Sequence, residues 1–176
     1  NVGAGQTVTF SNMTASTFDN NQDIIRINGA SGNENITGPD LAVIITIDSG
    51  QGDDNLVGGD DDDTLSAGDG NDTLDGGDGA DSLWGGDGDD LYLFNTNDVD
   101  SGESITEPTS GGTDVVVLNS TVDFSGMTVT SFDEVEGIRF AAANTTGTFT
   151  GAQLTGEALD LTETAAGTSN LVINVG

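Results

Sequence analysis

Apolar side chains recur at every ninth position between Ser49 and Leu93. Each one follows six residues that are mostly glycine and aspartate, and each lies between two neighbours that would point to the opposite side of an extended chain. One inward-facing residue with two outward-facing neighbours is the pattern of a very short β-strand. Two such strands and their loops would close a coil of roughly eighteen residues, so the pattern predicts a β-solenoid. The periodic residues are Leu56, Leu65, Leu74, Leu83 and Tyr92.

The six residues before each predicted strand repeat a loop motif. Glycine holds the second place in all five copies and the fourth place in four, and aspartate holds the sixth place in all five. Glycine accepts φ > 0, so each segment can curl tightly, turn carbonyl oxygens inward and place one carboxylate at its end. Calcium is bound by six to eight such oxygens. The copies are Ser49–Val57, Gly58–Ser66, Ala67–Asp75, Gly76–Trp84 and Gly85–Leu93.

In this block the chain resembles the RTX (repeats-in-toxin) family, whose nonapeptide repeats form a parallel calcium-binding β-roll. The resemblance implies that each calcium bridges a loop and the loop two repeats later. The implied pairs are Asp54 with Asp72, Asp63 with Asp81, and Asp72 with Asp90. We therefore expect about three internal calcium sites, and sites at the two ends of the roll are left open.

The predicted ligands are the sixth-position aspartates and the first four loop residues, whose backbone carbonyls should complete the shells. The second repeat has Asp61 where glycine is expected, so we expect its site with Asp81 to be distorted or weaker. The side-chain ligands are Asp54, Asp63, Asp72, Asp81 and Asp90; the loop positions are Gly50, Gly52, Gly58, Gly59, Asp60, Asp61, Ala67, Gly68, Asp69, Gly70, Gly76, Gly77, Asp78, Gly79, Gly85, Gly86, Asp87 and Gly88.

Short segments rich in β-branched residues flank the roll, which makes the predicted fold all-β throughout. Gly29–Thr37 and Gly38–Thr46 fit the nonapeptide frame loosely, with Glu34 in a sixth place, and Ile47-Asp48 would be an insertion before the good copies. The solenoid is therefore predicted to begin near Asn20 without metal sites. The predicted strands are Val2–Phe10, Asp23–Asn28, Ile36–Thr37, Ala42–Ile47, Val115–Leu118, Thr128–Phe132, Ile138–Ala142, Thr148–Thr150, Ala158–Leu161 and Leu171–Val175, and a hint of helical periodicity covers Phe132–Gly137.

Residues after the roll suggest a cap and a duplication. The segment Asn95–Asp114 carries Asp98, Asp100, Glu103 and Asp114, which either complete a terminal calcium site or are solvated loop acids. Phe10–Asp19 and Phe124–Asp133 share six of ten residues, which favours duplication of Thr-rich β segments over chance. We predict four segments: 1–48 leading into the solenoid, 49–93 as the roll, 94–122 as cap and linker, and 123–176 related to 9–57.

Composition narrows the functional classes. With 31 acidic residues against two basic ones, the net charge is −29, which excludes nucleic acid as a natural partner and disfavours anionic membranes. No histidine or cysteine is present, so zinc sites, disulfides and histidine-based triads are excluded. No motif singles out a catalytic pair, and no stretch reaches the length of a membrane span. We expect no enzyme activity and no membrane insertion. Salt adaptation is the other reading of the acidity, although the acids concentrate in one block.

The thin apolar ladder cannot offset the entropy of ordering so many glycines, so the roll should fold only on binding calcium. The family resemblance implies export by type I secretion and folding in extracellular calcium. We expect an extracellular or cell-surface structural module of a surface-layer protein, filament or adhesin, which would contact identical or neighbouring modules in an array or lattice. The alternative is the carboxy-terminal export module of a secreted enzyme or toxin. Ice binding by a threonine array is disfavoured because the threonine pairs share no period.

Overall fold

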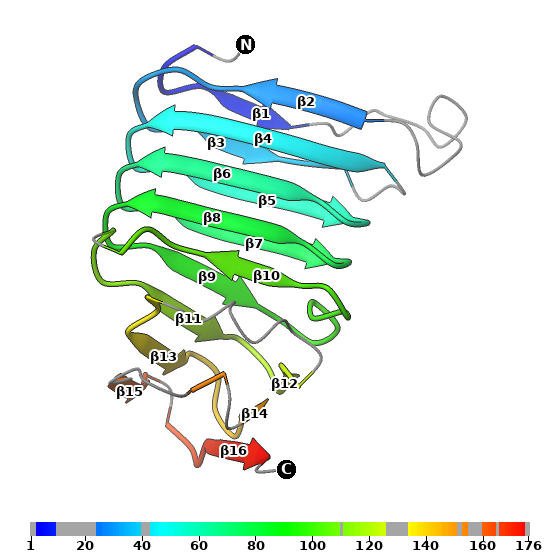
Figure 1. Cartoon of the computed structure of the whole chain (residues 1–176), viewed down its shortest axis with the longest axis vertical. Helices are drawn as coiled ribbons and strands as arrows, with labels where there is room; N and C mark the ends of the chain where they lie inside the picture. Colours follow the sequence, from blue (N-terminus) through cyan, green and yellow to red (C-terminus); the bar gives the residue numbers. More distant parts are fainter. Residues whose placement is uncertain are drawn as a thin grey trace.

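The computed structural model describes residues 3–9, 24–39, 43–109, 111–125, 134–150, 153–154, 160–164 and 166–174 of the 176-residue chain. These residues form an all-β, parallel β-solenoid, which confirms the predicted fold class. Its coils stack along one axis, with β1 and β16 at opposite ends (Figure 1). Among the described residues there is no helix that is long and apolar enough to cross a membrane.

Three parallel sheets line the solenoid. The eight-stranded sheet contains, in spatial order, β1 (Thr7–Thr9), β3 (Asn35–Thr37), β5 (Asn55–Asp60), β7 (Thr73–Asp78), β9 (Leu91–Phe94), β11 (Val115–Leu118), β13 (Gly137–Phe140) and β15 (Asp160–Glu163). The five-stranded sheet contains β10 (Ser104–Thr106), β8 (Ser82–Asp87), β6 (Thr64–Asp69), β4 (Ile44–Gln51) and β2 (Ile24–Asn28). The three-stranded sheet contains β12 (Val122–Asp123), β14 (Thr146–Thr150) and β16 (Asn170–Asn174).

The periodic apolar residues form the core between the two larger sheets. Leu56 pairs in register with Leu74, and Leu74 pairs with Tyr92, on one sheet. Leu65 pairs with Leu83 on the other. All five side chains are buried. One apolar residue in each nine is therefore enough to build a continuous ladder, because parallel in-register pairing stacks equivalent residues of successive coils.

The register corrects the predicted frame before the roll. Ile47 pairs with Leu65, and Gly50 pairs with Gly68. Ile45 thus stands in a sixth place and Ile47 in an eighth, so the extra residues precede Ile45 and the insertion is not Ile47-Asp48. The solenoid also begins earlier than Asn20, since β1 pairs with β3. The difference in frame arises because strand register follows the buried apolar residues, and Ile45 and Ile47 are both fully buried.

Residues after the roll continue the solenoid. The predicted strand Val115–Leu118 is confirmed as β11, while β10 and β12 were not predicted. Since β10 pairs with β8, the segment Asn95–Asp114 adds a last strand to the five-stranded sheet before the chain returns to β11. The predicted strand Thr128–Phe132 lies outside the described residues. The hint of helix is wrong in its described part, because Glu134 has φ 69° and Gly137 begins β13.

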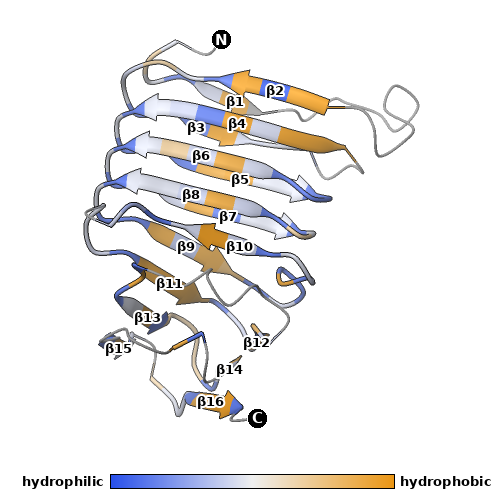
Figure 2. Ribbon diagram, viewed as in Figure 1, coloured by the Kyte–Doolittle hydropathy of each residue, from blue (hydrophilic) through white to orange (hydrophobic). Residues whose placement is uncertain are grey.

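The core changes character toward the C-terminal coils. Phe124 packs edge-on against Phe94, with ring centroids 5.0 Å apart, and stacks on Phe149 at 4.7 Å. Figure 2 shows apolar colour over much of β9 and β11 and in the middle of β10, whereas β6 and β8 of the roll are mostly pale. Aromatic packing thus replaces the thin leucine ladder where the acidic loops end.

The predicted duplication and the four-segment division stay predictions. Phe10–Asp19 lies outside the described residues, as does most of Phe124–Asp133. The strands that follow these segments, β2 with Arg26 and β13 with Arg139, belong to different sheets. The strands that follow the two similar segments therefore lie on different sides of the solenoid.

Candidate metal centre

The second and fourth loop positions adopt backbone conformations that favour glycine. Gly68 and Gly70 have φ of 115° and 145°. A Cβ at either would collide with the backbone carbonyl of the loop one coil earlier, that of Gly50 or Gly52. Successive loops therefore stack with their backbones in contact, and a side chain at these positions would force them apart.

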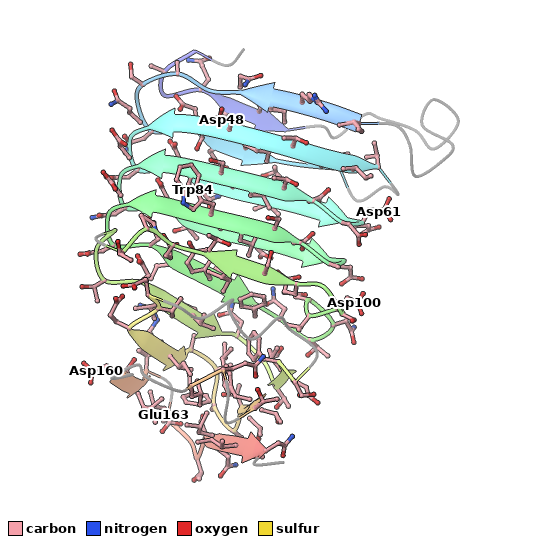
Figure 3. All side chains as sticks on the ribbon, viewed as in Figure 1. Asp48, Asp61, Trp84, Asp100, Asp160 and Glu163 are labelled. Atoms are coloured by element: carbon pink, nitrogen blue, oxygen red, sulfur yellow. The ribbon has the colours of Figure 1, made fainter. Side chains whose placement is uncertain are left out.

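Asp61 is the exception that the sequence singled out. It stands in a fourth position with φ 95°, the conformation that its glycine counterparts adopt. The loop thus keeps its path and the non-glycine residue bears the strain. Figure 3 shows Asp61 at the edge of the solenoid where the eight-stranded sheet leads into the five-stranded one, with Asp100 further along that edge. The expected weakening of a site with Asp81 is not tested by this geometry.

Alternate sixth-position aspartates, Asp54, Asp72 and Asp90, form a ladder along one edge of the solenoid. In each step, the backbone N–H of one ladder residue donates to a carboxylate oxygen of the next. The distances are 2.7 Å from Asp54 N to Asp72 Oδ1 and 2.8 Å from Asp72 N to Asp90 Oδ1, each across 18 residues. The ladder extends beyond the repeats at both ends. Glu34 N donates to Asp54 at 2.7 Å, Asp90 N to Asp114 at 2.9 Å, and Asp114 N to Glu136 at 2.7 Å.

A second, shorter ladder runs along the opposite edge. Ile45 N donates to Asp63 Oδ1 at 2.7 Å, Asp63 N to Asp81 Oδ1 at 2.8 Å, and Asp81 N to Glu103 Oε2 at 2.9 Å. The three predicted carboxylate pairs are therefore neighbours in the structure. The second ladder begins at Asp63, because the buried Ile45 holds the equivalent place one coil earlier.

The second carboxylate oxygen of each ladder aspartate, Oδ2, takes no part in the ladder hydrogen bonds. Oδ2 of Asp54, Asp63, Asp72, Asp81 and Asp90 is buried and has no hydrogen-bond partner among the described residues, and neither does Oε2 of Glu34. A Cβ added to Gly76 would collide with Asp81 Oδ2. The free oxygen thus faces the first residue of its own loop. Buried polar atoms in folded proteins are normally partnered, so a row of bare carboxylate oxygens indicates a site for a ligand.

The electrostatics of the ladders point the same way. Burial raises the pKa of Asp63 to about 8, against the N–H of Ile45, which lowers it, and the charges of Asp81 and Asp61 add to the rise. Burial, with smaller contributions from neighbouring aspartates, likewise raises the pKa values of Asp81 and Asp90 to about 7 and that of Asp72 to about 6. In the absence of a cation, the folded loops thus disfavour the ionised form of these carboxylates.

The donor set fits a hard divalent cation. The buried side-chain oxygens of these loops that lack a hydrogen-bond partner among the described residues are all carboxylate oxygens, and each stacked pair of loops adds backbone carbonyls. Calcium accepts six to eight oxygens of this kind in irregular arrangements. A calcium ion would supply positive charge between loops that otherwise repel one another.

The remaining predicted positions divide into buried and exposed groups. First-position residues Gly58, Ala67, Gly76 and Gly85 are buried against the ladders. Third-position residues Asp60, Asp69, Asp78 and Asp87 have exposed side chains. Three of the third-position carbonyls, those of Asp69, Asp78 and Asp87, accept backbone hydrogen bonds from Gly52, Asp61 and Gly70. The exposed carboxylates therefore contribute charge around the loops while the sixth-position carboxylates face the interior.

The terminal acids predicted after the roll separate in the same way. Asp114 and Glu103 each extend a ladder. Asp98 is buried and accepts hydrogen bonds from the backbone and side-chain nitrogens of Asn95, whereas Asp100 is exposed. Sequence reasoning missed Glu107, whose carboxylate lies with those of Asp90 and Asp114. The sequence feature that could have identified Glu107 is its position directly after the short segment that forms β10.

A family model described as RTX calcium-binding nonapeptide repeat (4 copies) matches residues 48–83 and 66–94. The matched region spans the loops of both ladders from Asp54 to Asp90. Neither a curated protein nor a solved structure matches the chain.

Proposed function

Residues 48–94 are RTX calcium-binding nonapeptide repeats, and from this premise we propose that the chain is a calcium-dependent scaffold segment of a secreted bacterial surface protein. The repeats make it a calcium-binding structural module. The row of buried, unpartnered Oδ2 atoms is the observation that carries the proposal, because these oxygens face the interior of stacked loops and lack any other partner among the described residues.

In this proposal each calcium binds between two stacked loops of one ladder. The pairs Asp54 with Asp72, Asp72 with Asp90, and Asp63 with Asp81 supply Oδ2 atoms, while Oδ1 atoms remain hydrogen-bonded to backbone N–H groups. Carbonyl oxygens of the first four loop positions complete the coordination. One oxygen of each aspartate therefore holds the backbone register and the other holds the metal.

Binding and folding are one event for the roll. The raised pKa values show that folded loops without a cation hold their carboxylates unfavourably. A ligand that binds only the folded state stabilises that state in proportion to the logarithm of its concentration. Calcium sites of weak extracellular modules have dissociation constants on the order of 10⁻⁴–10⁻³ M, so the roll would stay unfolded in the cytoplasm and fold outside the cell.

A scaffold role is supported by the continuation of the solenoid. Strands β11 to β16 extend the coils beyond the last repeat, with an aromatic core of their own. An elongated, acidic, metal-rigidified body suits a surface layer, filament or adhesin. Contact with neighbouring modules, type I secretion and the absence of catalysis belong to the same proposal, and an export module of a secreted enzyme is its competitor.

The test is a calcium titration of the chain, followed by far-UV circular dichroism and by the fluorescence of Trp84. This residue, the only tryptophan, lies on the outer face of β8 and is 44% exposed (Figure 3). We expect a steep gain of β signal near millimolar calcium and little response to magnesium, which requires a tighter octahedral shell. A chain that is fully folded in chelator and silent to calcium would refute the proposal.

A further inference from the structure

The loop that follows β10 differs from the five nonapeptides at the place where the next loop of the ladder of Asp54, Asp72 and Asp90 would stack. Asp114 takes the sixth-position role, accepting the N–H of Asp90 across 24 residues instead of 18. The longer loop brings in Glu107, which has no counterpart in the repeats. Glu107 Oε1 and Oε2 accept the backbone N–H groups of Gly85 and Gly86, both at 3.2 Å.

Three carboxylates meet in this loop. One oxygen from each of Asp90, Glu107 and Asp114 lies within 4.8 Å of the other two. Asp90 and Asp114 are 0% and 1% exposed, and Asp90 Oδ2 has no hydrogen-bond partner among the described residues. The cluster is therefore more than a patch of surface acids, because a fully buried oxygen is aimed into it.

The first residue of the last repeat, Gly85, marks the space between these groups. A Cβ placed on Gly85 would collide with Asp90 Oδ2 and would lie 2.7 Å from Glu107 Oε1 and 2.5 Å from Tyr92 Oη. Tyr92 Oη also accepts the N–H of Gly85 at 2.7 Å. Tyr92 is the only tyrosine of the chain and replaces the leucine of the other four repeats. Three oxygens thus converge where a side chain is absent.

We propose that Asp90, Glu107 and Asp114 form a further calcium site that closes the long ladder, with Tyr92 Oη beside the ion. The inference rests on the proposed function, since it assumes that the roll loads calcium. It differs from the sites between nonapeptide loops in its composition. Those sites draw two carboxylates from the repeats, whereas this one draws three, two of them from residues after the repeats. Three buried or half-buried carboxylates so close together need a cation to offset their repulsion.

Terbium provides a direct readout, because it takes the place of calcium among oxygen ligands and emits when a nearby aromatic ring is excited. The background variant is Trp84→Phe, so that Tyr92 is the sensitiser within the roll. We expect tyrosine-excited terbium emission that calcium displaces. Glu107→Gln should weaken the apparent affinity of this component at least tenfold. The matched control is Glu163→Gln, an exposed position on β15 far from the roll (Figure 3), which should leave the emission unchanged.

Two outcomes would overturn the site. One is a folded, calcium-responsive background variant that shows no tyrosine-excited terbium emission. The other is a Glu107→Gln variant whose terbium titration matches that of the Glu163→Gln control. The calcium response in circular dichroism separates this failure from failure of the proposed function: if dichroism responds and the terbium result is negative, only the terminal site is wrong. Emission from terbium at the Asp72–Asp90 site would survive Glu107→Gln. The terminal site is therefore measured by the part of the terbium emission that Glu107→Gln removes.

Discussion

The backbone N–H of Asp72 donates to Oδ1 of Asp90, 18 residues later, at 2.8 Å. Asp72 Oδ1 in turn accepts the N–H of Asp54 at 2.7 Å. A ladder carboxylate thus belongs to two coils at once, while its Oδ2 stays bare. The arrangement assigns different tasks to the two oxygens of one side chain, and a substitution can remove one task without the other.

Asp72→Asn removes the charge and one metal-binding oxygen while it keeps an oxygen acceptor for Asp54 N. We expect the calcium concentration at the folding midpoint to rise about tenfold, which corresponds to about 1.4 kcal/mol of lost binding free energy. The measurement is a calcium titration by circular dichroism. The matched control is Asp69→Asn in the same loop, which removes the same charge from an exposed side chain. Equal midpoints for the two variants would contradict the assignment of the ladder oxygens.

Asp61→Gly replaces the one non-glycine residue in the fourth loop position. Asp61 has φ 95°, which glycine adopts without strain. We expect calcium-saturated protein to gain about 1 kcal/mol in the free energy of unfolding, since relief of strain exceeds the added chain entropy. Urea unfolding in saturating calcium measures the change. Gly79→Ala, at the next fourth position of the same ladder, should lower stability sharply, because its Cβ would meet the backbone of Asp61.

The Asp61 variant also tests a second reading. Asp61 Oδ2 is buried without a hydrogen-bond partner among the described residues. If Asp61→Gly weakens calcium binding while it raises stability at saturation, this carboxylate is itself a ligand, and the departure from the motif supplies a donor to its site.

The sequence predicted the roll well because two independent signals coincide there. The leucine or tyrosine at each eighth position sets the strand register, and the aspartate at each sixth position sets the loop. In the copy just before the roll, Gly38–Thr46, only the apolar signal remains, and three isoleucines within four residues, Ile44, Ile45 and Ile47, allow more than one frame. The chain took the frame that buries Ile45 and Ile47, which no count of nonapeptides could decide.

The terminal cluster escaped sequence reasoning for a different reason. Glu107 lies 17 residues after Asp90, and the coil that joins Asp90 to Asp114 spans 24 residues, so neither follows the repeat. Glu103 and Asp114 were predicted as acids that either complete a terminal calcium site or are solvated, and the sequence did not decide between the two. Their ladder roles depend on β10 pairing with β8 and β11 pairing with β9, which are long-range pairings that no local pattern specifies.

Leu74→Ala should show how far the thin core contributes to stability. Leu74 is fully buried and pairs in register with Leu56 and Tyr92. We expect a loss of about 2–5 kcal/mol in the free energy of unfolding, as for other buried leucines. Urea unfolding in saturating calcium provides the measurement. Thr73→Ala, the half-buried neighbour that points to the opposite side of β7, is the control and should cost much less. Similar losses for both would mean that metal coordination alone holds the roll.

The pH dependence of the metal-free chain should be opposite to ordinary acid denaturation. The folded pKa values of Asp63, at about 8, and of Asp81 and Asp90, at about 7, lie above the value of about 3.9 for an unfolded aspartate. Between these limits the folded state binds more protons than the unfolded state. Its stability is therefore fully present below about pH 4 and is lost as the pH rises through 7 and 8. In chelator, we expect the β signal to increase as the pH falls from 8 toward 4.5.

Circular dichroism across this pH range, with and without saturating calcium, measures the effect. With calcium the sign reverses, because protons compete with the metal for the same Oδ2 atoms and the calcium midpoint should rise as the pH falls. Asp63→Asn provides the control, since a neutral side chain in this place removes the most strongly raised ladder aspartate and should flatten the chelator profile. A metal-free chain whose β signal is constant from pH 8 to 4.5 would show that the ladder carboxylates are not buried together without calcium.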